Sequence, residues 1–442
     1  MLVVSSVIGS GIFLTPGRVA DLLPHPGAIL AAWLAGGLLS AAGALANAEL
    51  GAMYPHAGGD YVYLREAYHP AAGFMVGWLT FFVIYAGSIA TLAAGFAEGL
   101  VHFVRLGATG KMLAAVAVTA VMSAVNYIGV RAGVRLNNVT AYCKMAALCA
   151  FVIAGPALGR GRIENLRPLL AGGSALHPAA FGLALSPVLF TYLGWNAPVY
   201  VASEIRCPSR TVPRSLFFGL GVCTLVYGLV NAVYVYAMPV ATLRGTVNVG
   251  EAAAGALFGP VAGSVVATFV LVSILGTLDA MILVGPRIAY AMALDGLFFA
   301  GAERVHESYR TPHRAIVVQG IAVVGLLAVL RTFPSVLDYT TFAIVLATIA
   351  DTSALYRLRW IRPRLERPYR AWGYPVVPAL YLLANAAIAA AMLRGRAREC
   401  AIGLAVAAAG FPLYWFFARG RQRRAVRETG NRTLAGPGSS DL

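Results

Sequence analysis

Val7-Ile8-Gly9-Ser10-Gly11-Ile12-Phe13 lies near the start of the chain, inside an apolar segment over residues 2–22 that is long enough to cross a membrane. Glycine has a low helix propensity, and Pro16 follows shortly after the two glycines, so an interrupted helix is predicted here. An interruption leaves backbone N–H and C=O groups unpaired, which the bilayer tolerates only where the segment lines a polar site. The alternative is that Gly9 and Gly11 form the contact at a helix crossing.

A second segment of the same character is Phe190-Thr191-Tyr192-Leu193-Gly194-Trp195-Asn196-Ala197-Pro198, in the sixth apolar segment. Gly194, Asn196 and Pro198 disfavour a continuous helix, since proline removes a backbone donor and clashes with the preceding turn. For this segment alone, a proline kink in an ordinary helix is the alternative. Two interrupted helices five spans apart are typical of inverted-repeat transporters, whose substrate site lies between them.

The composition indicates the class of protein. Of the 442 residues, 59% are hydrophobic and 12% are charged, and the mean hydropathy is +0.74. Soluble domains are far less apolar, so an integral membrane protein is predicted. The five cysteines and the isolated histidines lack metal-ligand spacing, so neither a metal site nor a cofactor is expected. No nucleophile and base are recognisable, and an enzyme is not expected.

Apolar runs of roughly 17 to 30 residues recur about twelve times, with short connectors between them. The predicted spans are residues 2–22, 28–54, 71–103, 112–128, 138–158, 179–205, 214–238, 258–292, 315–331, 336–356, 376–393 and 400–418. Residues 419–442 are rich in Arg, Gly and Ser and are predicted to form a disordered basic tail.

The basic residues are distributed unevenly between the predicted loops. If the N-terminus is cytoplasmic, the inner loops and the tail hold 21 of the 34 Lys and Arg residues, and the outer loops hold 10. The positive-inside rule therefore predicts a multi-pass protein of the inner (plasma) membrane with both termini in the cytoplasm. The net charge of +16 then fits a lipid bilayer with anionic headgroups, and no nucleic-acid partner is expected.

Several further motifs stand in order along the chain. They are Ile8-Gly9-Ser10-Gly11-Ile12-Phe13, Glu49-Leu50-Gly51 through Pro55, Gly58-Gly59-Asp60-Tyr61-Val62-Tyr63-Leu64-Arg65-Glu66, Phe190 to Asn196, Arg287 to Gly296, and Arg367-Pro368-Tyr369 through Pro378. In this set the chain resembles the amino acid, polyamine and organocation (APC) superfamily, and within it bacterial members of the L-type amino-acid transporter family.

The resemblance implies an all-α fold of about 12 transmembrane helices, a LeuT-like five-plus-five inverted repeat with broken helices 1 and 6. The first repeat would cover residues 1–158 and the second residues 179–357. Residues 376–418 would form the last two spans, followed by the tail at 419–442. The chain begins almost at the first interruption, so a truncated or misassigned start is expected.

The resemblance also implies a binding site for a zwitterion. The exposed amides at the start of the second half-helix would bind the substrate carboxylate, with help from a hydroxyl group: Gly9, Ser10 and Gly11. Free carbonyl groups would accept the substrate ammonium: Val7, Phe190, Thr191 and Leu193. Trp195 is a candidate aromatic wall or gate, and a plain packing or interfacial role is the alternative.

Lys144 is one of only two lysines and lies in the middle of an apolar run, where a lone ammonium is costly. In similar transporters a lysine on the fifth span stands where a sodium ion would bind, which implies sodium-independent transport. Lys144 would be a fixed cation or, with a depressed pKa, a proton carrier. The alternative is a structural lysine paired with a carboxylate such as Asp279. Asp279 could equally serve protons or satisfy another neighbour.

Charges near the predicted membrane boundaries have simpler interpretations. Glu49 is expected to shape the inner loop and gate. Arg287 and Glu204 are candidates for an inner-gate ion pair, with solvated helix ends as the alternative. The loop at residues 105–111 has no cysteine, where relatives with a glycoprotein heavy chain form their disulfide, so no disulfide-linked heavy chain is expected.

The function implied by these observations is secondary active transport of amino acids by alternating access. The preferred mode is sodium-independent exchange of neutral L-amino acids across the inner membrane. Proton-coupled uptake, or transport of a cationic amino acid or amine, is the alternative within transport. An amino-acid receptor that binds without transporting is the alternative from another class.

Overall fold

The computed structural model describes residues 2–56, 58–169, 178–299, 301–330 and 332–434, and every regular element in these ranges is helical. The elements before residue 170 are α1 (Leu2–Val7), α2 (Gly11–Leu14), α3 (Pro16–Leu22), α4 (Pro26–Met53), α5 (Asp60–Ala67), α6 (Pro70–Leu79), the π-helix η1 (Thr80–Tyr85), α7 (Ala86–Leu100), α8 (Ala108–Ile128), α9 (Val130–Leu158) and the 3-10 helix η2 (Ile163–Leu166).

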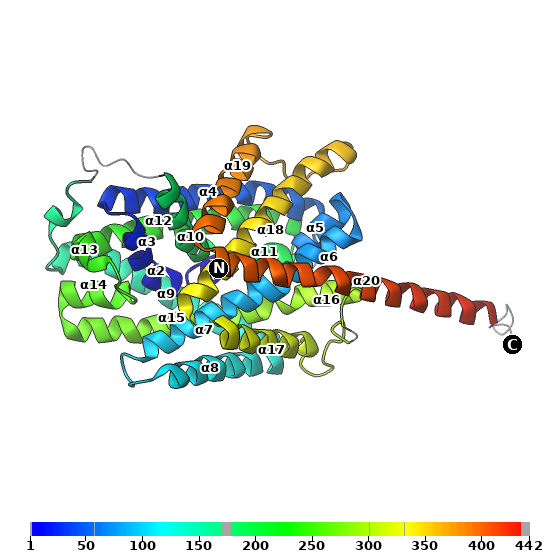
Figure 1. Ribbon diagram of the computed structural model, residues 1–442, viewed down its shortest axis with the longest axis horizontal. Coiled ribbons are helices and arrows are strands. Elements are labelled where there is room, and N and C mark those ends of the chain that lie inside the picture. Colours follow the sequence, from blue (N-terminus) through cyan, green and yellow to red (C-terminus); the bar gives the residue numbers. More distant parts are fainter. Residues whose placement is uncertain (1, 57, 170–177, 300, 331, 435–442) are drawn as a thin grey trace.

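The elements after residue 177 continue the bundle shown in Figure 1. They are α10 (Pro178–Tyr192), α11 (Ala197–Tyr200), the 3-10 helix η3 (Ala202–Glu204), α12 (Pro208–Ala237), α13 (Val240–Leu243), α14 (Val249–Phe258), α15 (Pro260–Val284), α16 (Pro286–Leu294), α17 (His313–Leu330), α18 (Phe333–Ile361), α19 (Val376–Gly395) and α20 (Ala397–Leu434).

Among the described residues, ten helices are long and apolar enough to cross a membrane, and each overlaps one predicted span. A further span is added if Leu2–Leu14 and Pro16–Leu22, which meet at 54°, are taken together. The remaining predicted span, 179–205, contains α10, an apolar helix of 15 residues that is shorter than a full crossing. The prediction of an all-α protein with many membrane-spanning helices is therefore confirmed.

Two short segments without helical structure lie inside predicted spans. The first interruption (residues 8–10) separates α1 from α2, and Pro16 begins α3 after a single intervening residue. The second interruption (residues 193–196) separates α10 from α11, with Gly194 at φ +101°. This φ favours glycine, because other residues are strained in that region of backbone space.

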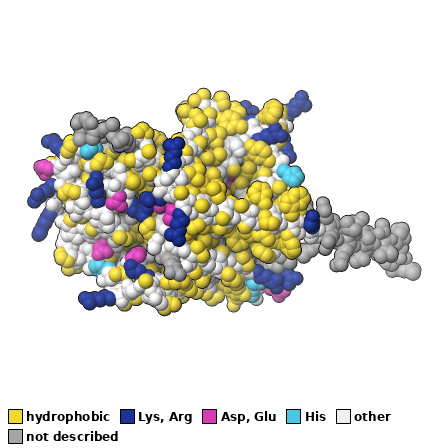
Figure 2. Space-filling model, viewed as in Figure 1, with side chains coloured by type: hydrophobic (Ala, Val, Ile, Leu, Met, Phe, Trp, Pro, Cys, Tyr) yellow, Lys and Arg dark blue, Asp and Glu magenta, His cyan; other side chains and the backbone are white. Residues whose placement is uncertain are grey.

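The helices pack around a core made mostly of apolar side chains. α4 lies against α12 over much of its length, α1 contacts α9, α12 and α15, and α10 contacts α4, α18 and α19. Figure 2 shows hydrophobic side chains over the middle and right of the visible face, with many of the Lys and Arg side chains towards the left and right ends. This distribution is the one expected of a protein whose apolar middle lies in a bilayer.

The C-terminal segment differs from the predicted disordered tail. α20 continues from Ala397 to Leu434, and its last part extends beyond the bundle in Figure 1. Residues 419–434 contain six Arg residues and one each of Ala, Gln, Glu and Leu, which are good helix formers, so the preceding helix propagates through them. Residues 435–442 lie outside the described part of the chain.

Candidate functional site

The two interruptions lie against each other in the interior of the bundle. A Cβ atom on Gly11 would lie 2.6 Å from the Thr191 Oγ1 atom, and one on Gly194 would lie 2.7 Å from the Ser6 carbonyl oxygen. The hydroxyl groups of Thr15 and Thr191 are hydrogen-bonded at 2.8 Å. Glycine at positions 11 and 194 therefore allows the two chain segments to approach closely.

Tyr227 on α12 connects the two segments. Its hydroxyl group lies 2.8 Å from the Val7 carbonyl oxygen and 3.2 Å from the Thr191 carbonyl oxygen, so its single O–H is shared between these two acceptors. The side chain is fully buried, with its ring packed edge-on against Trp33 and Tyr192. Two of the carbonyl groups predicted to accept a substrate ammonium thus share one protein donor, and each retains at least one lone pair for another donor.

The polar groups around Ser10 have no such partners. Ser10 is completely buried, and its Oγ atom makes no hydrogen bond among the described residues. In the same part of the structure, the backbone N–H groups of Gly9, Ser10 and Gly11 donate to no backbone carbonyl. Buried donors are almost always paired in native proteins, so this group of donors can bind an acceptor that is not part of the chain.

Lys144 on α9 extends into the first interruption. Its Nζ atom donates to the Ile8 carbonyl oxygen at 2.8 Å, the Thr277 Oγ1 atom at 2.7 Å and the Ser5 carbonyl oxygen at 3.4 Å. The residue is 1% exposed. The ammonium group therefore joins the end of α1 to α15, and its hydrogen bonds compensate its removal from water.

Asp279 on α15 lies near Lys144 without pairing to it. No ion pair within 4 Å joins these two side chains, both of which belong to the described residues. The Asp279 Oδ1 atom instead accepts a hydrogen bond of 2.8 Å from the Asn126 side chain on α8. The other carboxyl oxygen has no hydrogen-bond partner in the described structure.

A small cavity borders the second interruption. Its volume is about 20 Å³, and its lining includes Leu193, Gly194, Asn196, Tyr200, Asp60 and Met281. A cavity of this size holds about one water molecule, so the protein is closed around the second interruption.

Phe190 lies outside the cavity lining, and its carbonyl oxygen accepts a hydrogen bond from the Leu193 N–H group. Trp195 is buried against α4, 3.3 Å from the Cβ position of Gly43, and does not line the cavity.

A buried acidic residue at this cavity was missed by the sequence analysis as a site residue. Asp60, at the start of α5, is 2% exposed and accepts a hydrogen bond from the Tyr200 hydroxyl group, which in turn accepts one from Asn196. Burial raises the pKa of the Asp60 carboxyl, and hydrogen bonds with Tyr200 and Asp351 act in the opposite direction. The available signal was a carboxylate placed directly between Gly58-Gly59 and the aromatic and aliphatic run Tyr61-Val62-Tyr63-Leu64.

Ion pairs fix the ends of several helices around this interior. Arg287 Nε lies 2.7 Å from Glu204 Oε1, so these two residues do pair, at the surface end of η3. Glu49 is completely buried and binds Arg359, Arg367 and the backbone N–H of Ala371. Glu49 therefore holds the connection after α18 against α4, and no sequence pattern indicated its two arginine partners.

No group of three or more His, Cys, Asp or Glu side chains in the described ranges is arranged to hold a metal ion. The polar groups at the two interruptions are instead N–H and hydroxyl donors, carbonyl acceptors and one ammonium. Such a set recognises an uncharged or zwitterionic small molecule by hydrogen bonds, without metal coordination.

Comparisons with known proteins agree with this chemistry. Residues 1–416 match the family model described as amino acid permease. The chain is 28% identical over 420 residues to the serine/threonine exchanger SteT of Bacillus subtilis (strain 168), covering 94% of this chain and 94% of that protein. It is 30% identical over 389 residues to the human b(0,+)-type amino acid transporter 1, covering 86% of this chain and 78% of that protein.

A third relative is the Asc-type amino acid transporter 1 of Mus musculus, which is 28% identical over 444 residues and is covered to 83% of its length. The family match spans almost the whole helical bundle, including both interruptions. The chain therefore belongs to the amino acid permease family of the APC superfamily and is a multi-pass membrane transporter of amino acids, not an enzyme.

Proposed function

We propose that this protein exchanges neutral L-amino acids across the plasma membrane by alternating access, without sodium. The observation that supports this most is the contact between the two interruptions, where buried donors without partners lie next to carbonyl groups. The donors around Ser10 would bind the substrate carboxylate, and the carbonyl groups of Val7, Phe190, Thr191 and Leu193 would accept its ammonium group.

The independence from sodium rests on Lys144. An ammonium group that is bound by the Ile8 carbonyl and the Thr277 hydroxyl occupies the kind of oxygen-lined space that a sodium ion would otherwise require. Lys144 would therefore supply a permanent positive charge at the place where, in a sodium-dependent transporter, a sodium ion binds and leaves again. The similarity to SteT, a serine/threonine exchanger, supports exchange as the mode of transport here.

The architecture that we propose is a five-plus-five inverted repeat over residues 1–158 and 179–357, with both termini cytoplasmic. The interruptions five predicted spans apart support it. In this arrangement the Arg287–Glu204 pair and the Glu49 cluster would close the cytoplasmic side. The absence of cysteine from residues 105–111 supports action without a disulfide-linked heavy chain.

The space at the site requires a conformational change for binding. A cavity of about 20 Å³ is too small for any amino acid, so the helices must separate before a substrate enters. After this separation the cavity would be larger, and the side chain of a bound amino acid, pointing from the first interruption towards Leu193, would occupy it. Trp195, which now packs on α4, would act as a wall only after such a movement.

Proton-coupled uptake is a second candidate, and one observation favours it. The Asp279 oxygen without a partner is a buried acceptor that a proton would satisfy. A proton that Asp279 takes up from one side of the membrane and releases to the other would change the total charge of Asp279 and Lys144 beside the first interruption.

Counterflow in proteoliposomes distinguishes these candidates. Uptake of labelled alanine, serine, leucine and arginine is measured in sodium-free buffer, with and without unlabelled amino acid inside, and with an imposed pH gradient. Exchange predicts uptake of neutral amino acids that requires internal amino acid and is unaffected by sodium or the gradient. Uptake into empty vesicles driven by the proton gradient would contradict exchange. Binding without uptake in any condition would identify a receptor.

A further inference from the structure

Two buried carboxyl groups meet beside the second interruption, and the proposed function assigns a role to neither. Asp60 begins α5 and Asp351 lies on α18, with 2% and 1% of their surfaces exposed. The two side chains are hydrogen-bonded to each other. A carboxylate has no hydrogen to donate, and two adjacent carboxylates repel each other, so one of these two groups must carry a proton.

The surroundings of this acidic pair, Asp60 and Asp351, favour a bound proton. Neither carboxyl group forms an ion pair within the described part of the chain. Asn47 on α4 hydrogen-bonds to Asp351. The Asn47 Oδ1 atom and the Tyr63 hydroxyl group are buried and lack a hydrogen-bond partner in the same described structure. Excess negative charge is costly in such an interior, and binding one proton reduces it.

The groups that face the acidic pair from neighbouring elements are uncharged or are paired elsewhere. The titratable groups that interact with it are phenol hydroxyls, which are neutral at physiological pH: those of Tyr63, Tyr85, Tyr200 and Tyr381. Glu49 on α4 pairs with Arg359, and Asp295 beside α16 pairs with Arg65. The charge of the acidic pair is therefore set by its own proton.

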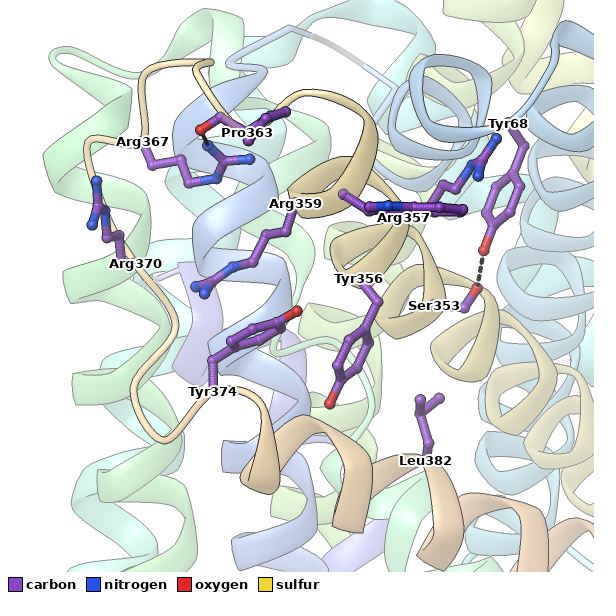
Figure 3. Close-up of a pocket in the computed structure, with 11 residues that line it drawn as sticks. Tyr68, Ser353, Tyr356, Arg357, Arg359, Pro363, Arg367, Arg370, Tyr374 and Leu382 are labelled. Carbon is purple, nitrogen blue, oxygen red and sulfur yellow. Dashed lines mark hydrogen bonds between the residues drawn. The ribbon is translucent and has the colours of Figure 1, made fainter.

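The acidic pair connects three elements around the second interruption. Tyr200, the last residue of α11, donates a hydrogen bond to Asp60 and accepts one of 3.2 Å from Asn196 inside the interruption. The pair itself joins α5 to α18. Figure 3 shows a second contact between these elements, in which the Tyr68 hydroxyl donates a 3.1 Å hydrogen bond to Ser353 Oγ at the exposed end of α5. Loss of the proton would leave two adjacent anions that push α5 and α18 apart.

We propose that Asp60 and Asp351 bind one proton between them and that this proton controls opening of the protein on its cytoplasmic side. With the proton bound, α5, α11 and α18 are held together and the second interruption is closed. When the proton passes to cytoplasmic water, the two carboxylates repel and the helices separate, so a substrate can enter or leave. This inference rests on the exchange and the orientation proposed above. A gradient made by acidifying only the outside leaves the internal pH, and therefore this site, unchanged.

Counterflow at equal pH on both sides of the proteoliposome membrane tests this proposal. Exchange of labelled for unlabelled serine by the full chain is measured between pH 5 and 8. The wild-type rate is expected to rise roughly tenfold, because the ratio of proton-free to proton-bound sites changes about tenfold per pH unit. Asp351→Asn keeps a donor to Asp60 at every pH, so its exchange is expected to be slow and independent of pH. A wild-type rate that is independent of pH would overturn the proposal.

A matched control separates the proton from the contact between α5 and α18. Tyr68→Phe removes the hydrogen bond to Ser353 between the same two elements but no acidic group. This variant is expected to keep the wild-type dependence on pH. If Tyr68→Phe lost that dependence as completely as Asp351→Asn, the contact and not the proton would set the rate, which would contradict the proposal.

Infrared difference spectra detect the proton independently of transport. The C=O stretch of a protonated carboxyl group is distinct from the bands of a carboxylate. The purified wild-type protein is expected to lose such a band as the pH rises, and Asp60→Asn and Asp351→Asn are each expected to lack it. A pH-dependent carboxyl band that is the same in the wild-type protein and both variants would overturn the proton site. If the wild-type protein exchanged no amino acid, the proposed function would fail, and these spectra would still decide whether the proton site exists.

Discussion

The first and second interruptions differ in what holds them. The first, residues 8–10, is fixed by side chains from distant helices, because Lys144 on α9 binds the Ile8 carbonyl and Tyr227 on α12 binds the Val7 carbonyl. The second, residues 193–196, is closed mainly by local turn hydrogen bonds and borders the cavity at Asp60. The comparison indicates that the first interruption is held in place by side chains from distant helices, whereas the second borders the space into which the molecule can rearrange.

The largest expected effect comes from removing the anchor of the first interruption. Lys144→Ala leaves the Ile8 carbonyl and the Thr277 hydroxyl without their charged donor, and hydrogen bonds to charged groups contribute about 1.5–3 kcal/mol. We expect the melting temperature to fall and amino-acid exchange to be lost in sodium-free buffer. Sodium ions should restore part of the exchange if Lys144 takes the place of a cation.

The other lysine is a natural control for this prediction. Lys111 pairs with Glu98 at 2.7 Å in a partly exposed position, where ion pairs contribute little. Lys111→Ala is therefore expected to leave both melting temperature and exchange close to wild type. If the Lys144→Ala variant exchanged amino acids at the wild-type rate in sodium-free buffer, this result would contradict the proposed role of Lys144.

A smaller effect is expected where the two interruptions touch. Gly11→Ala introduces a Cβ atom 2.6 Å from Thr191 Oγ1 and 2.9 Å from the Thr191 Cα atom, so the backbone must shift. We expect a loss of about 1–3 kcal/mol in stability and a strong decrease in exchange. Gly221→Ala on α12, whose Cβ position has no neighbour within 4 Å, should be neutral or slightly stabilising. Thermal melting of both variants measures the difference.

Tyr227→Phe tests the link between the two interruptions. The substitution keeps the ring packing against Trp33 and Tyr192 but removes the hydroxyl that binds the Val7 and Thr191 carbonyls. A loss of about 1–2 kcal/mol is expected, together with roughly tenfold slower exchange. Unchanged counterflow kinetics would show that the two segments do not depend on this hydroxyl.

The smallest effect is a pH dependence that is specific to the second interruption. Because burial raises the pKa of Asp60 in the folded protein, its carboxyl keeps a proton at pH values where the unfolded chain, with a pKa of about 4, has lost it. Its contribution to stability is therefore present below the unfolded pKa and is lost as the pH rises through the folded pKa. The titratable groups that interact with it are Asp351, Tyr200, Tyr63, Tyr85 and Tyr381.

Melting temperatures between pH 4.5 and 8 measure this effect. The wild-type melting temperature should decrease with rising pH more steeply than that of Asp60→Asn, which has no titrating group at this position. Glu366→Gln, at an exposed position, should follow the wild-type curve. Parallel curves for the wild-type protein and Asp60→Asn would show that Asp60 does not titrate in this range.

Parts of the fold and the site follow directly from sequence. The long helices could be predicted because the apolar runs are long and separated by polar connectors, and Lys144 was recognisable because a single lysine stands in such a run. The partners of the interruptions could not be predicted. Tyr227 is one of 20 tyrosines, and nothing local marks it as the donor to carbonyls 220 and 36 residues away.

Other features depend on tertiary contacts in the same way. Asp60 and Asp351 come from α5 and α18, and Glu49 meets Arg359 only because α18 returns to α4. The helix through residues 419–434 was missed because basic composition was interpreted as disorder, although the same residues favour continuation of an existing helix.

Counterflow kinetics of Ser10→Ala test the central claim most directly, that the first interruption binds the substrate carboxylate. Ser6→Ala is the matched comparison, because Ser6 is buried with an equally unpartnered hydroxyl but lies within α1. We expect Ser10→Ala to raise the half-saturating concentration of labelled serine roughly tenfold, through loss of one charge-assisted hydrogen bond, and Ser6→Ala to leave it unchanged. Equal half-saturating concentrations for Ser10→Ala and the wild-type protein would contradict the account.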